Sequence, residues 1–420
     1  MTQSTTAQAR TPGTEDSSVR PMLLAASIVS AVFILSNSPT PLYVRWQHEL
    51  GFSSGMLTVI FAAYIAGLLA TLVVAGQAAD RYGRKQVLIP GIVVALAASV
   101  LFTTASSVTA LVIARFLTGV AVGVVVSAGM AAVVDLGGPR RHSQASLIAS
   151  VAMVLGAGLG PLLAGLVAQW TTAPIVPIFT AEFLLLLAAL IVACRLPISR
   201  PQRPDMTAGV VAGFRMHLPG VARENRRHLA FGIAAFAPGI TATSFVLSLG
   251  PSLLSTLLGV ASPLIAGGTA CVMFLTATAA QFAVSRWTTS RILTLSTAAT
   301  LTAMVALVVA VTGSFTIPLV TAAILAGAGQ GLGQLGGLRL IGAHVPSTRR
   351  AEANSVLNIG GYIPAGILPV ATGYLIDTVG LANGATLFAT ILGLSAVGGG
   401  LFVHRRRTEL VVPVVASSSQ

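Results

Sequence analysis

Apolar residues in this chain run in continuous blocks of roughly twenty residues and do not alternate with polar ones. A block of that length lets a helix cross ~30 Å of hydrocarbon at ~1.5 Å per residue. The blocks are too uniformly apolar for the strands of a barrel, so helices must satisfy the backbone groups. We therefore predict twelve membrane-spanning helices at residues 21–44, 54–79, 87–104, 108–136, 145–169, 175–197, 229–250, 258–284, 292–312, 316–345, 353–376 and 384–404.

Composition narrows the class of protein further. Hydrophobic residues make up 55% of the chain, the mean hydropathy is +0.88, and charged residues reach only 8%. A soluble enzyme, a disordered scaffold and a disulfide-stapled secreted module are all excluded by such values. Cys194 and Cys271 lie in apolar blocks, the histidines do not cluster, and no phosphate-binding glycine-lysine loop occurs. We expect no metal, no cofactor and no ATP-driven transport.

The net charge of +13 is explained by its distribution along the chain. Of the 24 basic residues, 21 fall in alternate connections between the predicted helices, and Arg45 lies in a connection of the other set. By the positive-inside rule, both termini are expected in the cytoplasm and the protein in the plasma membrane. This distribution favours membrane topology over a nucleic-acid partner.

The domain organisation follows from the one long polar connection, which divides the spans six and six. We expect a disordered cytoplasmic tail (1–20), an N-terminal six-helix bundle (21–197), a cytoplasmic linker (198–228), a C-terminal six-helix bundle (229–404) and a second tail (405–420). Within the linker, Met206 to Val221 could form a short amphipathic stretch on the membrane surface. No signal peptide is recognised before Arg20.

The two halves resemble each other in sequence. One constant shift superposes glycines and prolines of the second half on those of the first: Gly119 on Gly327, Gly123 on Gly331, Pro161 on Pro369 and Gly165 on Gly373. Because six is even, both bundles enter the membrane in the same direction and form parallel repeats around a central cavity. This arrangement is typical of a transporter that rocks its halves around a site at the midplane.

The connection after the second predicted helix carries a recognisable motif, Gly-Gln-Ala-Ala-Asp-Arg-Tyr-Gly-Arg-Lys. Its glycines permit close helix approach and a tight turn, and its aspartate can pair with Arg84 or with the start of a neighbouring helix. The motif resembles the signature of the major facilitator superfamily. By that resemblance it forms a conformational latch, with Asp135 as a further charge; an ordinary basic loop is the alternative. The latch residues are Gly76, Asp80, Arg81, Gly83, Arg84, Lys85 and Asp135.

Two ionisable residues inside predicted spans are candidates for coupling transport to protons. Arg115 lies about seven residues into the fourth helix, and with Gly119 and Gly123 it resembles the superfamily's arginine motif. Its counterpart in the other half is Ala323, so the charge is not required by the architecture. Glu182 is the one carboxylate well inside a span, although the family fold places the sixth helix at the lipid-facing periphery. Snorkelling to the membrane surface is the alternative for both side chains.

The fifth predicted helix resembles the glycine-proline motif of superfamily antiporters, carried by Gly156, Gly160, Pro161 and Gly165. Glycines at four-residue spacing flatten one face for close packing, and proline removes a backbone donor. The helix is expected to act as a hinge or seal, against an alternative of packing alone. The copy on the eleventh helix keeps Pro369 and Gly373 but has Leu368 before the proline.

In the superfamily, the first, fourth, seventh and tenth helices line the cavity. Their polar residues, with three from the eleventh helix, are candidate substrate contacts: Asn37, Thr241, Thr243, Ser244, Gln330, Gln334, Asn354, Asn358 and Tyr362. For each, a hydrogen bond to a backbone carbonyl or a neighbouring helix is the competing interpretation. The prolines in Asn37-Ser-Pro-Thr-Pro-Leu-Tyr43 would break the first helix and expose carbonyls.

These features predict an all-α membrane protein of the major facilitator fold that is a transporter and not an enzyme. The favoured function is a proton-coupled antiporter that exports small amphipathic or drug-like molecules, acting as a monomer in the bilayer. The alternative is a facilitator or proton symporter for a small polar nutrient such as a sugar or organic acid. The sequence does not identify the substrate, and no acidic residue in the first helix matches the proton-antiporter pattern.

Overall fold

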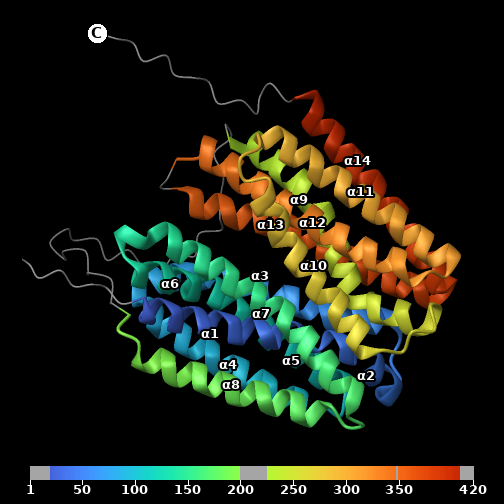
Figure 1. The fold of residues 1–420 in the computed structure, drawn as a ribbon, viewed down its shortest axis with the longest axis horizontal. Helices are drawn as coiled ribbons and strands as arrows, with labels where there is room; N and C mark the ends of the chain where they lie inside the picture. The colour runs from blue at the N-terminus through green and yellow to red at the C-terminus, as the bar shows by residue number, and fades with distance from the viewer. Residues whose placement is uncertain (1–18, 199–224, 347–348, 407–420) are drawn as a thin grey trace, which may run out of the picture.

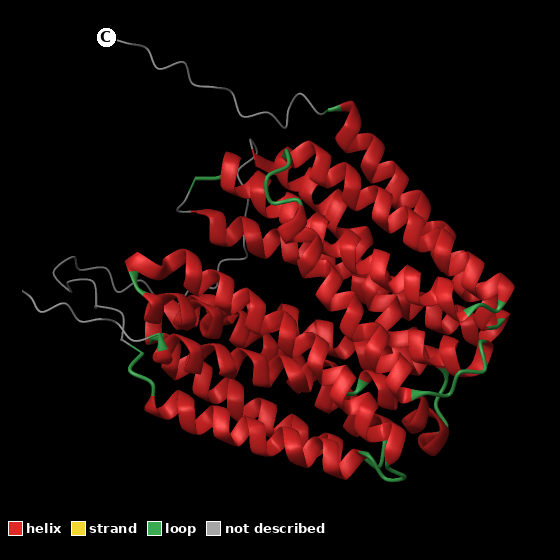
Figure 2. Ribbon diagram, in the orientation of Figure 1, coloured by secondary structure: helices red, strands yellow, loops and turns green. Residues whose placement is uncertain are grey.

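The structure is a computed structural model that describes residues 19–198, 225–346 and 349–406. Across these residues the elements are helices joined by short turns (Figures 1 and 2). Twelve helical segments of the described chain are long and apolar enough to cross a membrane, which confirms the predicted spans. The predicted amphipathic stretch from Met206 to Val221 and most of both predicted tails lie outside the described residues.

The first half contains six spans. Its elements are α1 (Arg20–Asn37), η1 (Thr40–Leu42), α2 (Tyr43–Leu50), α3 (Ser54–Tyr82), α4 (Arg84–Thr103), α5 (Val108–Val124), η2 (Val125–Gly129), α6 (Met130–Gly137), η3 (Pro139–Arg141), α7 (His142–Trp170) and α8 (Ile175–Arg195). The first span combines α1, η1 and α2, and the fourth combines α5, η2 and α6.

The second half contains the other six spans. Its elements are α9 (Arg226–Ser252), η5 (Leu253–Leu257), α10 (Pro263–Ala283), α11 (Thr289–Gly313), α12 (Thr316–His344), α13 (Arg350–Val379) and α14 (Leu381–Arg405). Most boundaries lie within three residues of the predicted ones, because hydropathy decides where a chain leaves the hydrocarbon. Two in this half differ more: the seventh span continues through η5 to Leu257 and not 250, and α10 begins at Pro263 and not 258.

The first span differs from the prediction of a helix over residues 21–44. The helix α1 ends at Asn37, a 3-10 turn follows at Thr40–Leu42, and α2 continues the span to Leu50. Pro39 and Pro41 supply no backbone N–H, so the hydrogen-bond ladder cannot pass through this segment. We call residues 37–41 the α1 break.

Glycines bring neighbouring helices into backbone contact at equivalent places in the two halves. A Cβ on Gly119 of α5 would collide with the carbonyl of Tyr64 in α3. A Cβ on Gly327 of α12 would likewise collide with the carbonyl of Met273 in α10. The glycines that repeat in the sequence therefore allow the same close approach of two helices in each half.

The spans alternate in direction, so Arg20, Arg84, Arg140, Arg226 and Arg405 lie at one face of the molecule, which we call the basic face. The two halves touch each other chiefly through α7 against α10 and through α3 against α13. In Figure 1 the ribbons of the halves run together around α2 and diverge toward the end of α6. At the face opposite the basic face, hydrogen bonds join the start of α3 to the end of α13 and the start of α10 to the end of α7, so the halves are closed on each other there.

Two helices contain a wide π-helical turn. One, η2, joins α5 to α6 toward the basic face, and the other, η5, follows α9 toward the opposite face. Such turns are uncommon in α-helices, and they space the backbone hydrogen bonds more loosely than an α-helix does.

Candidate functional site

Arg115 of α5 is completely buried in the first half. Its Nε donates a hydrogen bond to the hydroxyl of Tyr43, and its Nη1 donates one to the carbonyl of Ser36, both at 2.5 Å. The side chain therefore points into the protein and does not snorkel. One of its partners is thus a backbone carbonyl next to the α1 break.

The bond to Ser36 has a clear local cause. A carbonyl at this position in a continuous helix would accept a hydrogen bond from the N–H four residues later, but α1 ends at Asn37. Arg115 supplies the missing donor from a neighbouring helix. Its Nη2 is buried without a hydrogen-bond partner among the described residues.

Aromatic rings complete the surroundings of the guanidinium. The rings of Tyr43, Phe61 and Tyr64 lie 5.1, 5.7 and 5.8 Å from the guanidinium carbon. Ring faces attract a cation, and the attraction grows when water is excluded. Arg115 is held by this aromatic cage and two hydrogen bonds, with no carboxylate salt-bridged to it among the described residues.

Glu182 of α8 is also buried, with 6% of its surface exposed. Although α8 was expected at the lipid-facing periphery, Glu182 does not snorkel to the membrane surface and points toward the α1 break. Ser38 in that break is within hydrogen-bonding reach of the Glu182 carboxyl group. The α1 break thus lies between Arg115 on one side and Glu182 on the other.

The glycine-proline helix α7 packs against both halves. Added Cβ atoms on Gly156 and Gly160 would collide with the carbonyls of Ser30 and Ile34 in α1. A Cβ on Gly165 would instead collide with the carbonyl of Pro263 in α10, in the second half. The motif therefore joins α1 and α10 through backbone contacts on two sides of one helix.

The latch residues at the basic face are only partly brought together. Arg84 pairs with Asp135 at 2.9 Å, and of the two partners considered for Asp80 this structure does not pair it with Arg84. Asp80 is exposed, and nothing lies within 4 Å of a Cβ added to Gly76, which therefore makes no close helix approach. These observations agree with the divergence of the halves at the basic face.

The other latch residues have local structural roles. Gly83 turns the chain between α3 and α4 with φ at +102°. Lys85 donates hydrogen bonds to the carbonyls of Cys194 and Leu196 at the end of α8. Arg81 stacks over the ring of Tyr82 next to it, at 5.6 Å from the centroid.

We predict that Gly83→Val slows transport without weakening substrate binding. The positive φ of Gly83 strains any residue with a Cβ by ~1–3 kcal/mol, and the strain falls on a turn remote from Arg115. The maximal transport rate and the binding affinity of purified protein should be measured separately. Loss of binding in a correctly folded variant would contradict a purely conformational role.

The candidate substrate contacts divide into two groups. Thr241 and Thr243 are buried, and each donates its hydroxyl hydrogen to a carbonyl of its own helix, at 2.7 and 2.9 Å. Such bonds satisfy the hydroxyl locally, as the competing interpretation holds. Ser244 is buried beside them, and Asn37 is buried in the first half, where its amide donates to the Ser36 hydroxyl at 2.9 Å.

The second group has polar atoms still available. Gln330 and Asn354 are half-buried, and their amide oxygens have no hydrogen-bond partner among the described residues. Asn358 donates to the carbonyl of Asn354 at 3.0 Å. Gln334 is half-buried one turn from Gln330. These amides are the stronger candidates for contact with a polar part of a substrate.

Two tyrosines of the first half, Tyr43 and Tyr64, were missed by the sequence-based list of sites, which did contain Tyr362. Tyr43 binds Arg115, and the ring of Tyr64 lies against the guanidinium of Arg115. Tyr362 meets the ring of Phe236 edge-on, with centroids 6.5 Å apart. Tyr43 ends the proline-containing motif of the first span, so its position next to a break was the available signal.

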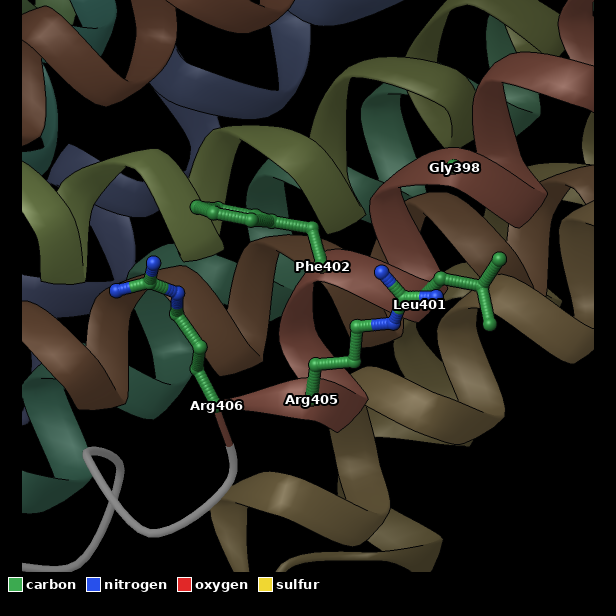
Figure 3. A pocket seen from close by; sticks show the side chains of 5 residues that line it. All are labelled: Gly398, Leu401, Phe402, Arg405 and Arg406. Atoms are coloured by element: carbon green, nitrogen blue, oxygen red, sulfur yellow. The ribbon is translucent and has the colours of Figure 1, made fainter.

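A surface pocket of about 440 Å³ lies apart from all of these residues, near the basic end of α14 (Figure 3). It is lined by Gly398, Leu401, Phe402, Arg405 and Arg406. The residues come from a single helix, and none of the predicted site residues borders the pocket. Within the described residues, no group of three or more His, Cys, Asp or Glu side chains could hold a metal ion.

Comparison with known families decides the class of protein. The family model described as Major Facilitator Superfamily matches residues 22–312. The chain belongs to this superfamily. As a member of the Major Facilitator Superfamily it is a multi-pass membrane transporter of small molecules and not an enzyme.

Two curated relatives match shorter segments of this transporter. A triacylglyceride transporter of Mycolicibacterium smegmatis is 30% identical over 175 residues, which cover 40% of this chain and 31% of the relative. The multidrug resistance protein MdtL of Escherichia coli is 33% identical over 124 residues, covering 29% of this chain and 32% of MdtL. The matched segments therefore span only about a third of either relative's length.

Solved structures of other transporters share the whole fold. A mutant of the nucleoside transporter NupG superposes with a TM-score of 0.68 at 14% identity, covering 93% of this chain and 99% of NupG. A bacterial homologue of the lysosomal transporter Spinster, inward-facing and unoccupied, gives 0.65 at 16% identity and covers 95% and 97%. The peptide transporter POT in complex with alafosfalin gives 0.71 at 14% identity and covers 93% and 94%.

Proposed function

We propose that this transporter is a proton-coupled antiporter that exports small amphipathic or drug-like molecules by alternating access. The observation that carries the proposal is the α1 break, which is bound by buried Arg115 on one side and approached by buried Glu182 on the other. Ionisable residues inside a membrane bundle are costly and commonly belong to ion or proton pathways.

Burial of Glu182 supports a proton on its carboxyl group. Only 6% of its surface is exposed, and its Oε2 has no hydrogen-bond partner among the described residues. An ionised carboxylate is costly in such surroundings, whereas a protonated one is far less so. Binding and release of that proton would change a contact made directly to the α1 break.

The class of substrate is proposed from the names of the relatives. The relatives include a multidrug resistance protein and a triacylglyceride transporter, and these names refer to drugs and to a lipid. The packing of α7 against α1 and α10 supports antiport, because exchange requires a seal that does not leak the coupling ion. We further propose a monomer in the plasma membrane with both termini in the cytoplasm, since the basic residues gather at one face.

The alternative function, uptake of a small polar nutrient, is favoured by one observation. The amide oxygens of Gln330 in α12 and Asn354 in α13 have no hydrogen-bond partner among the described residues and could accept hydrogen bonds from hydroxyl groups. A facilitator or proton symporter for a sugar or organic acid would use such groups. The direction of proton dependence separates the two functions.

The deciding experiment uses purified protein in liposomes with an imposed proton gradient. Fluorescent amphipathic dyes are tested against radiolabelled sugars and organic acids, with the gradient in each direction. Antiport requires dye to move against the proton flow and to stop when the gradient is collapsed. Movement of a polar nutrient with the protons would establish the alternative, and gradient-independent movement would remove proton coupling.

We predict that Glu182→Gln uncouples transport from the gradient while keeping exchange of substrate. Glutamine has the shape of protonated glutamate and can still hydrogen-bond with Ser38, but it cannot release a proton. Dye accumulation should therefore become independent of the gradient. Glu49→Gln is the matched control, because Glu49 is 44% exposed and pairs with Arg45 on its own helix at 2.7 Å. Full gradient dependence in Glu182→Gln would exclude Glu182 as the proton carrier.

A further inference from the structure

A carboxylate joins the two halves at the face opposite the basic face. Asp377, in the last turn of α13, accepts a hydrogen bond from the backbone N–H of Ser54 through Oδ1 and from that of Gly55 through Oδ2, each at 2.9 Å. Ser54 and Gly55 begin α3, where backbone N–H groups have no partner within the helix. A negative charge at a helix start is also favoured by the helix dipole.

A related contact occurs on the other side of the molecule. The Ser262 hydroxyl donates to Oε1 of Gln169 at 2.8 Å, joining the start of α10 to the last turn of α7. The shift that superposes the two halves places Ser262 on Ser54 and Asp377 on Gln169. The same pair of helix ends thus meets twice, and only the α3–α13 contact carries a charge.

Helices α3 and α13 pack so closely around Asp377 that these contacts can exist only while this face is closed. A Cβ on Gly55 would lie 2.6 Å from the ring of Tyr374 and 2.8 Å from Oδ2 of Asp377. A Cβ on Gly373, one turn earlier in α13, would collide with the hydroxyl of Thr58. These glycines let the end of α13 rest on the start of α3, so the carboxylate is positioned by the helices and not by its own flexibility.

We propose that Asp377 and the first turn of α3 form a charged lock that holds the opposite face closed, and that Gln169 with Ser262 forms its weaker, neutral counterpart. The lock rests on the alternating-access part of the proposed function and requires no particular substrate or coupling ion. When the molecule opens toward this face, α13 and α3 must separate, and the carboxylate exchanges two backbone donors for water. Asp377 is therefore a positioning residue that sets the balance between the two access states.

The chain contains a natural reporter for this balance. Cys271 of α10 is buried and lies against Gly158 of α7, where the two halves meet. It is eight residues beyond Pro263, about 12 Å along the helix from the opposite face at ~1.5 Å per residue. Replacing exposed Cys194 by serine leaves Cys271 as the single thiol, and its alkylation by N-ethylmaleimide in nanodiscs follows opening of the α7–α10 contact.

Two variants remove the lock from its two sides. Asp377→Asn removes the charge and leaves one acceptor for two donors. Ser54→Pro removes one donor, and proline suits the first helical position because Ser53 before it is already extended, with ψ at 169°. In each variant, N-ethylmaleimide should alkylate Cys271 about tenfold faster than in the parent. Hydrogen bonds to a charged group are among the stronger ones, so their loss should raise the population of the open state by about that factor. The double variant should be no faster than Asp377→Asn alone.

Controls separate the lock from general loosening. Glu49→Gln removes an exposed carboxylate at the same face that pairs within its own helix, and it should leave the alkylation rate unchanged. Gln169→Ala should raise the rate less than Asp377→Asn does. The lock is excluded if Asp377→Asn and Ser54→Pro keep the parental melting temperature and Cys271 is alkylated in them at the parental rate. It is also excluded if Glu49→Gln accelerates alkylation of Cys271 as much as Asp377→Asn does. The readout requires no transport, so it stands apart from the test of antiport.

Discussion

Arg115→Ala should abolish proton-driven transport while leaving the protein inserted in the membrane. The substitution leaves the Ser36 carbonyl buried without its donor, at a cost of ~1–3 kcal/mol, and it removes the cation from its three aromatic rings. Both losses fall on the α1 break, where the proposed coupling takes place. Gradient-driven dye uptake in liposomes measures the effect.

Graded variants distinguish the role of Arg115 from a general loss of stability. Arg115→Lys keeps the charge but can reach only part of the two acceptors, so partial activity is expected. Tyr43→Phe removes one acceptor and should fall between Arg115→Lys and the parent. Arg339→Ala is the matched control, because Arg339 also binds two backbone carbonyls from within a span, but at the surface. Normal coupling in Arg115→Ala would show that this arginine is only a structural anchor.

The second large effect is expected for Gly267→Ala at the contact between the halves. An alanine Cβ there would collide with the carbonyl of Pro161 in α7, and neither backbone can yield without moving a helix. The α7–α10 contact should loosen, and the transport rate should fall about tenfold, in line with overpacking of a tight core. Passive proton leak into liposomes with a pH-sensitive dye reports whether the seal has opened.

The chain offers a close control for this substitution. Gly268 is the next residue of α10, yet nothing lies within 4 Å of a Cβ added to it. Gly268→Ala should therefore transport and seal as the parent does. If both variants behave alike, the effect of the first reflects helix propensity or membrane insertion and not the contact with Pro161.

The membrane spans and the class of fold were predictable because hydropathy and charge distribution act locally along the chain. The α1 break was only half predictable. Pro39 and Pro41 predicted the end of the helix. Helix α2, which extends the first span to Leu50, was not predicted, because Arg45, His48 and Glu49 give it the hydropathy of a loop. Tertiary packing, with Tyr43 and Trp46 buried, keeps it helical.

The partners of the functional residues were less predictable, since they depend on which helices meet. The prolines of the first span predict exposed carbonyls, but only the crossing of α5 with α1 shows that the carbonyl of Ser36 is a partner of Arg115. Asp377 looks in the sequence like a solvated residue at a helix end. Its role emerges only when α13 is placed on α3, because the pairing groups are backbone N–H groups, which no side-chain pattern reveals.

The two π-helical turns lie at different depths in the two halves. The turn at Val125–Gly129 lies inside the fourth span (Val108–Gly137), and the turn at Leu253–Leu257 ends the seventh span at the face opposite the basic face. A wide turn is where a helix bends most readily, so the first half is expected to bend within the bilayer and the second half at its surface. The two halves are therefore mechanically unequal, although their sequences repeat.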